Sequence, residues 1–108
     1  MDYRNLIHEF DAWGDANGNE GCEMVVRMRH RAVKNLLGDD SIGSEKISEF
    51  IAANPEKYIH GLAETAQRGS WRPFDKAGTP ERTLAEKLTN LVLDLGRTAR
   101  SQRIPIKN

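Results

Sequence analysis

The sequence of 108 residues contains little cysteine, few aromatic residues, no net charge and no long apolar run. Its one cysteine, Cys22, excludes a disulfide within the chain and a zinc site built from several cysteines. With 16 acidic and 16 basic side chains, the chain lacks the positive excess typical of proteins that coat nucleic acid. No run approaches the roughly 18 apolar residues of a membrane span, and the acidic, amphipathic first residues lack the apolar segment of a secretory signal. We therefore expect a cytoplasmic protein.

The composition is that of a globular domain, with 38% hydrophobic and 30% charged residues. Two tryptophans, two tyrosines and three phenylalanines are too few to fill a core, so aliphatic side chains must supply most of the packing. At this length we expect a single helical domain over residues 1–101 and an extended tail at 102–108.

Hydrophobic periodicity predicts five helices, and the clearest spans residues 79–101. Thr79 is placed to cap this helix and Pro80 to occupy its first position, while Gly96 is expected to interrupt it. A stripe of apolar residues follows one side: Leu84, Leu88, Leu91, Val92 and Leu95. The other helices are predicted at residues 2–17, 22–37, 45–53 and 55–68. No segment alternates as a strand would, so the prediction is an all-α fold, a compact five-helix bundle or orthogonal helical array.

Breaks between the helices are marked by turn-forming residues. The segment 17–21 contains two glycines and two asparagines and is expected to separate the first two helices. Ser44 and Asn54 are expected to cap the third and fourth helices. In the second helix the apolar side is predicted to be Val25, Met28, Ala32 and Leu36, flanked by Val26, Val33 and Leu37, and Cys22 to be a small buried residue.

The second helix also carries the strongest concentration of charge. Four cations occur within eight residues without an acid among them: Arg27, Arg29, Arg31 and Lys34. The simplest interpretation is a solvated face that pairs with the acidic first helix, which carries Glu9, Asp11 and Asp15. The same cations could instead contact the phosphates of a nucleic acid or an acidic protein surface. A second basic group, near the end of the chain, comprises Arg97, Arg100, Arg103 and Lys107. The helix dipole alone favours Arg97 and Arg100, by about 0.3–1 kcal/mol each.

Two further groups are candidates for function. Trp71, Arg72 and Phe74 lie between the last two helices and are residue types that anchor interfaces, although the aromatic rings could equally close the core. His60 and Glu64 are four residues apart on one helix face and could act as ligands or as acid and base. No third ligand stands near them in the sequence, so a helical side-chain pair is the simpler interpretation.

One segment has a loose similarity to a known family. The stretch GTPERTLAEKLTNLVLDL resembles the last helix of the all-α nucleoside triphosphate pyrophosphohydrolases, the MazG-like group, which hold magnesium with several carboxylates. The resemblance implies Glu86 and Asp94 as candidate ligands, with Glu64 on the preceding helix. The sequence departs from the family pattern because Thr83 stands where a glutamate is expected, and because the two acids are eight residues apart rather than seven.

These observations favour a small non-enzymatic interaction protein, a regulator, inhibitor or adaptor whose partner is another protein. We expect no cofactor and no metal. The predicted partner-binding residues are Arg27, Arg29, Arg31, Lys34, Trp71, Arg72, Phe74, Arg97 and Arg100. The alternatives are nucleic-acid binding through the Arg27–Lys34 face and a divergent MazG-like hydrolase that depends on magnesium. A homodimer through the Leu84–Leu95 face is a further expectation, because so long a stripe could exceed what the other helices cover.

Overall fold

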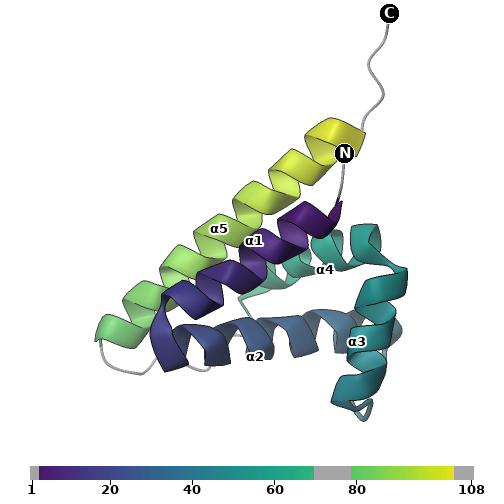
Figure 1. Ribbon diagram of the computed structural model, residues 1–108, viewed down its shortest axis with the longest axis horizontal. Helices are drawn as coiled ribbons and strands as arrows, with labels where there is room; N and C mark the ends of the chain where they lie inside the picture. The colour runs from purple at the N-terminus through teal and green to yellow at the C-terminus, as the bar shows by residue number, and fades with distance from the viewer. Residues whose placement is uncertain (1–2, 70–78, 104–108) are drawn as a thin grey trace, which may run out of the picture.

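The computed structural model describes residues 3–69 and 79–103, with side chains at 3–69 and 83–101. These residues form five α-helices and no strand, so the all-α prediction is confirmed (Figure 1). The helices are α1 (Tyr3–Ala16), α2 (Gly18–Leu37), α3 (Ser44–Ala53), α4 (Pro55–Arg68) and α5 (Thr79–Arg103). Within the described chain, no helix combines the length and the apolar character needed to cross a membrane.

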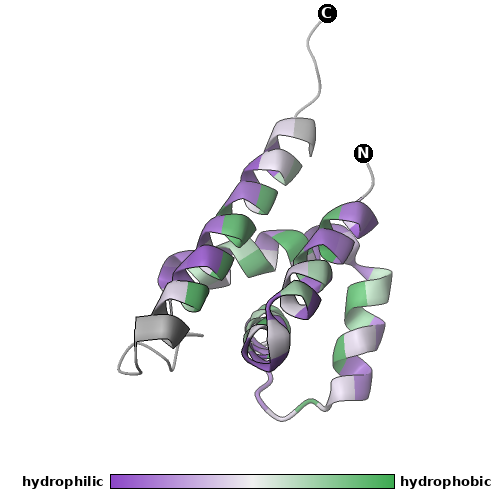
Figure 2. Ribbon diagram, turned by 60° about the vertical axis from the view of Figure 1, so that its left-hand side comes forward, coloured by the Kyte–Doolittle hydropathy of each residue, from purple (hydrophilic) through white to green (hydrophobic). Residues whose placement is uncertain are grey.

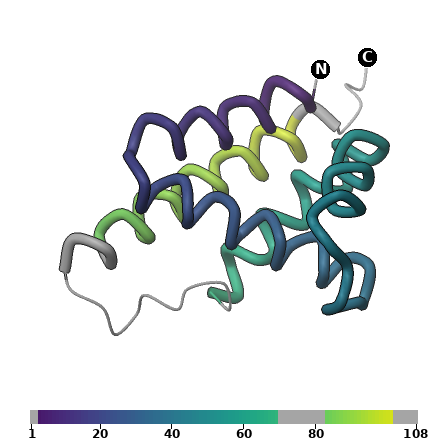
Figure 3. Tube along the Cα trace, turned by 60° about the horizontal axis from the view of Figure 1, so that its bottom comes forward, coloured from purple at the N-terminus to yellow at the C-terminus, as the bar shows by residue number. Residues whose placement is uncertain are grey.

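The first two helices form an antiparallel hairpin, and the other three pack around it. α4 and α5 lie against each other, and both also contact α1 and α2. α3 stands across one end of the molecule, where it links α2 to α4 (Figures 1 and 3). The result is a helical bundle with one transverse helix, so residues from four different helices meet near that end.

The core is aliphatic, as the shortage of aromatic residues requires. Figure 2 shows that hydrophobic residues gather on the inward sides of the helices. In α5 the predicted stripe is confirmed, because Leu88, Val92 and Leu95 are buried and Leu84 and Leu91 pack against the core while partly exposed. The apolar surface that suggested a homodimer is therefore in contact with the chain's own helices. The fully buried larger side chains are Phe10, Met24, Met28, Ile47, Tyr58, Ile59, Leu62, Leu88, Val33 and Val92.

The connection between α1 and α2 is shorter than predicted. We expected residues 17–21 to form a non-helical segment between the two helices. Instead α1 ends at Ala16 and α2 begins at Gly18, so only Asn17 links them. Gly18 has a φ of +74°, a conformation open to glycine that turns the chain sharply. The Asn17 side chain donates a 2.7 Å hydrogen bond to the Trp13 carbonyl, one of the carbonyl groups in the last turn of α1 that lack a partner within the helix.

The predicted start of α4 is correct and that of α3 is one residue late, but neither Ser44 nor Asn54 caps its helix with its side chain. Gly43, not Ser44, precedes the first turn of α3, and Ser44 is the first helical residue. Asn54 makes no capping bond to α4 and donates instead to the Phe50 carbonyl of α3, at 3.1 Å. Pro55 occupies the first turn of α4, as predicted, because that position needs no backbone N–H.

The prediction that Gly96 interrupts the last helix is wrong. α5 continues through Gly96 to Arg103, two residues into the segment expected to be extended. The glycine has a packing role, because a Cβ at this position would lie 2.6 Å from the Cβ of Ala63 in α4. A side chain at position 96 would therefore prevent α4 and α5 from approaching as closely as they do.

Candidate functional site

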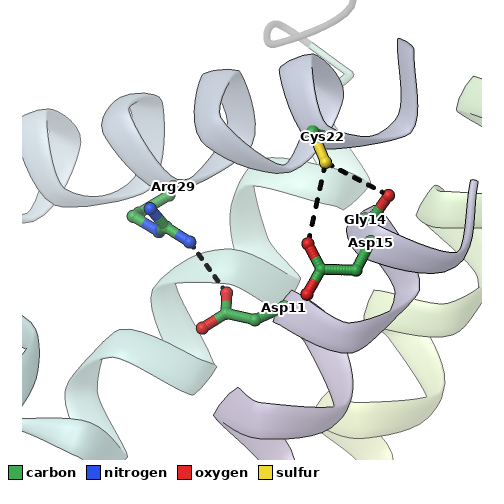
Figure 4. A network of polar contacts seen from close by, with 5 residues as sticks. All are labelled: Asp11, Gly14, Asp15, Cys22 and Arg29. Atoms are coloured by element: carbon green, nitrogen blue, oxygen red, sulfur yellow. Dashed lines mark hydrogen bonds and ion pairs between the residues drawn. The ribbon is translucent and has the colours of Figure 1, made fainter. Parts of the chain in front are cut away.

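Polar contacts between α1 and α2 begin to define a site. Arg29 makes a 2.8 Å ion pair with Asp11, and Figure 4 shows the two side chains reaching toward each other from the two helices. Nearer the turn, the Cys22 sulfur lies 3.4 Å from the Gly14 carbonyl oxygen and 3.7 Å from a carboxylate oxygen of Asp15. The interpretation that the basic helix pairs with the acidic first helix therefore holds for Arg29.

Beside this ion pair lies a cleft of about 360 Å³, which we name the Tyr58 cleft. Four helices contribute to it, because α3 and α4 meet the α1–α2 hairpin at this end of the bundle. Its polar lining comprises Arg4, Asp11, Arg29, Ser48 and Tyr58. Its apolar lining comprises Ile7, Ile51 and Ala52.

Tyr58 is the most unusual member of this lining. Its side chain is fully buried and its oxygen lies near the Arg29 guanidinium, yet its hydroxyl hydrogen has no acceptor among the residues that the structure describes. Burial raises the pKa of Tyr58 far above its ordinary value, although the nearby charge of Arg29 opposes the rise. The hydroxyl is therefore protonated at neutral pH and retains a hydrogen that it can donate.

Arg29 remains charged in this setting. Burial acts to lower the pKa of Arg29, but Tyr58 and the Asp11 carboxylate raise it by more, so the net change is upward. A guanidinium has five N–H donors. The bond to Asp11 uses one Nη2 donor, so Arg29 can hold Asp11 and still offer donors to a further group.

The other cations of α2 occupy a different side of the helix. Arg27 is exposed, Lys34 is half-buried, and Arg31 makes a 3.5 Å ion pair with the exposed Asp40. His30 lies among them, and its pKa is lowered by burial, then by the charges of Lys34 and Arg29. The imidazole is therefore mostly neutral at pH 7.

The prediction for the apolar side of α2 is partly wrong. Met28, Ala32 and Val33 are buried, whereas three residues expected beside them are exposed: Val26 at 42%, Leu36 at 39% and Leu37 at 46%. Val26, His30 and Leu37 recur at the spacing of a single helix face. We name the exposed side the α2 outer face, formed by Val26, Arg27, His30, Arg31, Lys34 and Leu37. Cys22 is also exposed rather than buried, and it lies in the first turns of α2, beside the link between the two helices.

Leu36 points to a separate groove between α2 and α4. This groove has a volume of about 460 Å³, and Leu36 reaches it because Gly61 of α4 has no side chain to exclude it. His60 and Glu64 both line it, so their predicted sharing of a helix face is correct. The groove is lined by Leu36, Glu56, Lys57, His60, Gly61 and Glu64.

The carboxylates proposed for magnesium do not converge. Glu64 makes a 3.7 Å ion pair with Arg68, Asp94 pairs with Arg97, and Glu86 is exposed. Among the described side chains, no three histidine, cysteine or acidic residues are grouped so that they could hold a metal ion. The geometry thus removes the arrangement that the hydrolase hypothesis required.

The remaining predicted residues are only partly described. Arg97 and Arg100 are exposed near the end of α5, which lies beside the start of α1 in Figures 1 and 3. The basic group of α2 lies elsewhere, because α2 runs along the edge of the molecule opposite to α5 in Figure 1. Trp71, Arg72 and Phe74, together with the side chains of Arg103 and Lys107, lie outside the described residues.

The sequence did not identify the Tyr58 cleft. The spacing of Tyr58 along its helix is that of a core residue, and Asp11 stood out only as one acid of the first helix. The one available signal was the position of Arg29, which lies off the line of Arg27, Arg31 and Lys34 on the helix.

Comparison with protein-family models, with curated proteins and with solved structures gave no match to this chain.

Proposed function

We propose that this protein is a small non-enzymatic interaction protein, which acts in the cytoplasm and binds an acidic surface of another protein through the α2 outer face. The observation that carries the proposal is the exposure of Val26 and Leu37 on a helix whose other side is buried. Large apolar side chains at the centre of a surface, with polar residues around them, are typical of protein interfaces.

The charge on this face indicates the chemistry of the partner. Val26, His30 and Leu37 form a stripe along this face. Three cations, Arg27, Arg31 and Lys34, lie beside it, and together they favour carboxylates on the opposing surface. His30, within the stripe, is mostly neutral at pH 7 because its pKa is lowered. The face is therefore an uncharged stripe beside cations, and it suits a partner whose apolar side chains are bordered by acids.

A nucleic acid fits this face less well. Phosphate binding uses cations and needs no apolar stripe, and at least two of the four cations predicted for it, Arg29 and Arg31, already have acidic partners. Arg29 in particular is directed toward α1 and the Tyr58 cleft. The contacts made by the α2 outer face thus favour a protein over a phosphate backbone.

The proposal is tested by affinity capture from a lysate of the source organism, with the full chain as bait. We expect the wild-type chain to capture an acidic protein that is identified by mass spectrometry. The double variant Val26→Ser/Leu37→Ser should lose that protein, since each side chain contributes apolar area to the contact. Charge reversal in Arg27→Glu/Lys34→Glu should weaken capture, most strongly at low salt.

The chain offers a matched control for the loss of an exposed leucine. Leu36→Ser changes the residue next to Leu37, but its side chain faces the groove beside Gly61. Capture retained by Leu36→Ser and lost by Val26→Ser/Leu37→Ser supports the proposal. Capture unaffected by the double variant, with circular dichroism confirming its fold, would refute it. Salt-sensitive DNA binding that depends on Arg27 and Lys34 alone would establish the nucleic-acid alternative.

A further inference from the structure

The Tyr58 cleft has no role in the proposed protein contact. Its lining comes from α1, α2, α3 and α4, and the one α2 residue among them, Arg29, is not part of the α2 outer face. Its volume of about 360 Å³ lies within the range of small-molecule sites, which combine apolar walls with a few polar groups. The cleft can therefore be considered as a binding site in its own right.

A hydrogen-bond donor lies unused in this cleft. The hydroxyl of Tyr58 is buried, and its hydrogen has no acceptor among the described residues. Buried polar groups in folded proteins are almost always paired, so an unpaired one calls for an explanation such as a bound ligand, ion or water. Neighbouring side chains also fix the ring, because Tyr58 is fully enclosed by the core. A ligand in the cleft would meet an oriented donor.

The charges of the lining favour an anion. Arg4 and Arg29 carry two positive charges and Asp11 carries one negative charge, so the lining has a formal charge of +1. A monoanion would balance this charge, whereas a dianion would exceed it and would also approach the Asp11 carboxylate.

The apolar walls of the cleft indicate the chemistry of the ligand beyond its charged group. Ile7, Ile51 and Ala52 line the cleft next to these polar groups. They would contact a hydrocarbon body and would gain nothing from an inorganic ion. We propose that the Tyr58 cleft binds a small carboxylic acid with a short hydrocarbon body, and that the Tyr58 hydroxyl and the Arg29 guanidinium donate hydrogen bonds to its carboxylate.

The test uses hexanoate as the probe, with three comparison compounds. Hexanamide has nearly the same shape without the charge, hexylamine reverses the charge, and inorganic phosphate has charge without the hydrocarbon body. Each compound is titrated into the ¹⁵N-labelled full chain, and backbone amide and arginine Nε–H signals are followed by NMR. We expect saturable shifts with hexanoate at Arg29, Tyr58 and residues 48–52, and much weaker effects with the others.

Variants separate the proposed contact from a general effect of the fold. Tyr58→Phe removes only the hydroxyl and should weaken hexanoate binding about tenfold, as expected for a hydrogen bond to a charged group. Tyr3→Phe is the matched control, because Tyr3 is not part of the lining and packs near His60. Arg4→Gln changes an exposed residue and provides a second variant, which should also weaken binding because it removes one positive charge.

The outcomes decide the proposal independently of the protein partner. Hexanoate binding that is weakened by Tyr58→Phe and Arg4→Gln but not by Tyr3→Phe supports it. Equal binding of hexanamide would overturn the role of charge, and preferred binding of hexylamine would overturn its sign. Preferred binding of phosphate, or no saturable shift with millimolar hexanoate, would overturn the ligand assignment.

Discussion

The contact between Gly96 of α5 and Ala63 of α4 predicts the effect of adding a single methyl group. In the variant Gly96→Ala the new Cβ would lie 2.6 Å from the Cβ of Ala63, whereas carbon atoms in ordinary contact are about 3.5–4.0 Å apart. Neither atom belongs to a flexible side chain, because both are fixed to helix backbones. The two helices must therefore separate by about 1 Å at this point.

Two opposing effects set the magnitude. Alanine is favoured over glycine in a helix interior by about 1 kcal/mol, which would stabilise the variant. Overpacking a close contact costs about 1–3 kcal/mol. The close approach of α4 and α5 should prevail, so we expect Gly96→Ala to lower the free energy of unfolding by about 1 kcal/mol.

Urea denaturation followed by circular dichroism measures this difference. For a chain of this size the loss should appear as a fall in the midpoint of about 0.5 M urea, without a change in slope. Asn90→Ala is the control for helix propensity, because Asn90 is exposed on the same helix and its replacement should raise the midpoint slightly. In the double variant Gly96→Ala/Ala63→Gly the opposing methyl is absent, so the two changes should be coupled favourably.

The reasoning would be refuted by two results together. The first is a rise in the midpoint for Gly96→Ala that equals or exceeds the rise for Asn90→Ala. The second is additivity of Gly96→Ala and Ala63→Gly, which would mean that the two positions do not touch. In that case Gly96 would be tolerated by the helix without being required by its packing.

Three further predictions concern the core, the ion pair and the histidine. Leu88→Ala should lower the free energy of unfolding by about 2–5 kcal/mol in urea denaturation, since Leu88 is fully buried in the core, and a loss below about 1 kcal/mol would contradict its central position. Asp11→Asn should lower it by about 1 kcal/mol at low salt and by less in molar salt, because the side chains of Arg29 and Asp11 are 27% and 43% exposed and solvent screens the pair; an effect that does not vary with salt would argue against an ionic contribution. An NMR titration should give His30 a pKa below the ordinary value, and Lys34→Gln should raise it, because burial and the charge of Lys34 both disfavour the imidazolium. His30 then binds a proton more tightly in the unfolded chain than in the folded one. The stability linked to neutral His30 is therefore present above about pH 6.5 and is lost as the pH falls. An unchanged pKa of His30 in Lys34→Gln would contradict this assignment.

The helices were predictable because their signals are local. The stripe from Leu84 to Leu95 repeats with the helical period, and Pro55 marks the start of α4 because it needs no backbone N–H there. The link at Asn17 was not predictable in the same way. Turn-forming residues indicate where a chain bends, but the sharp turn at Gly18 allowed α2 to begin four residues early. Gly96 was misread because a tertiary contact outweighed its low helix propensity.

The candidate site was harder to predict because it depends on which helices meet. Arg29 and Asp11 are 18 residues apart in the chain and become partners only through the α1–α2 hairpin. Tyr58 has the spacing of a core residue, and nothing local shows that it also lines a cleft. Exposure of Val26 and Leu37 likewise follows from where α3 and α4 pack against α2, which the sequence pattern of α2 alone does not contain.

The position of Cys22 gives this protein a natural attachment point for a reporter group. It is the only cysteine in the sequence, it is exposed, and its sulfur lies beside the Gly14 carbonyl and Asp15 at the end of α1. A maleimide fluorophore or nitroxide would therefore modify the wild-type chain at one place. That place lies where α1 and α2 meet, so the label's mobility would report separation of the hairpin during unfolding or when the α2 outer face is bound.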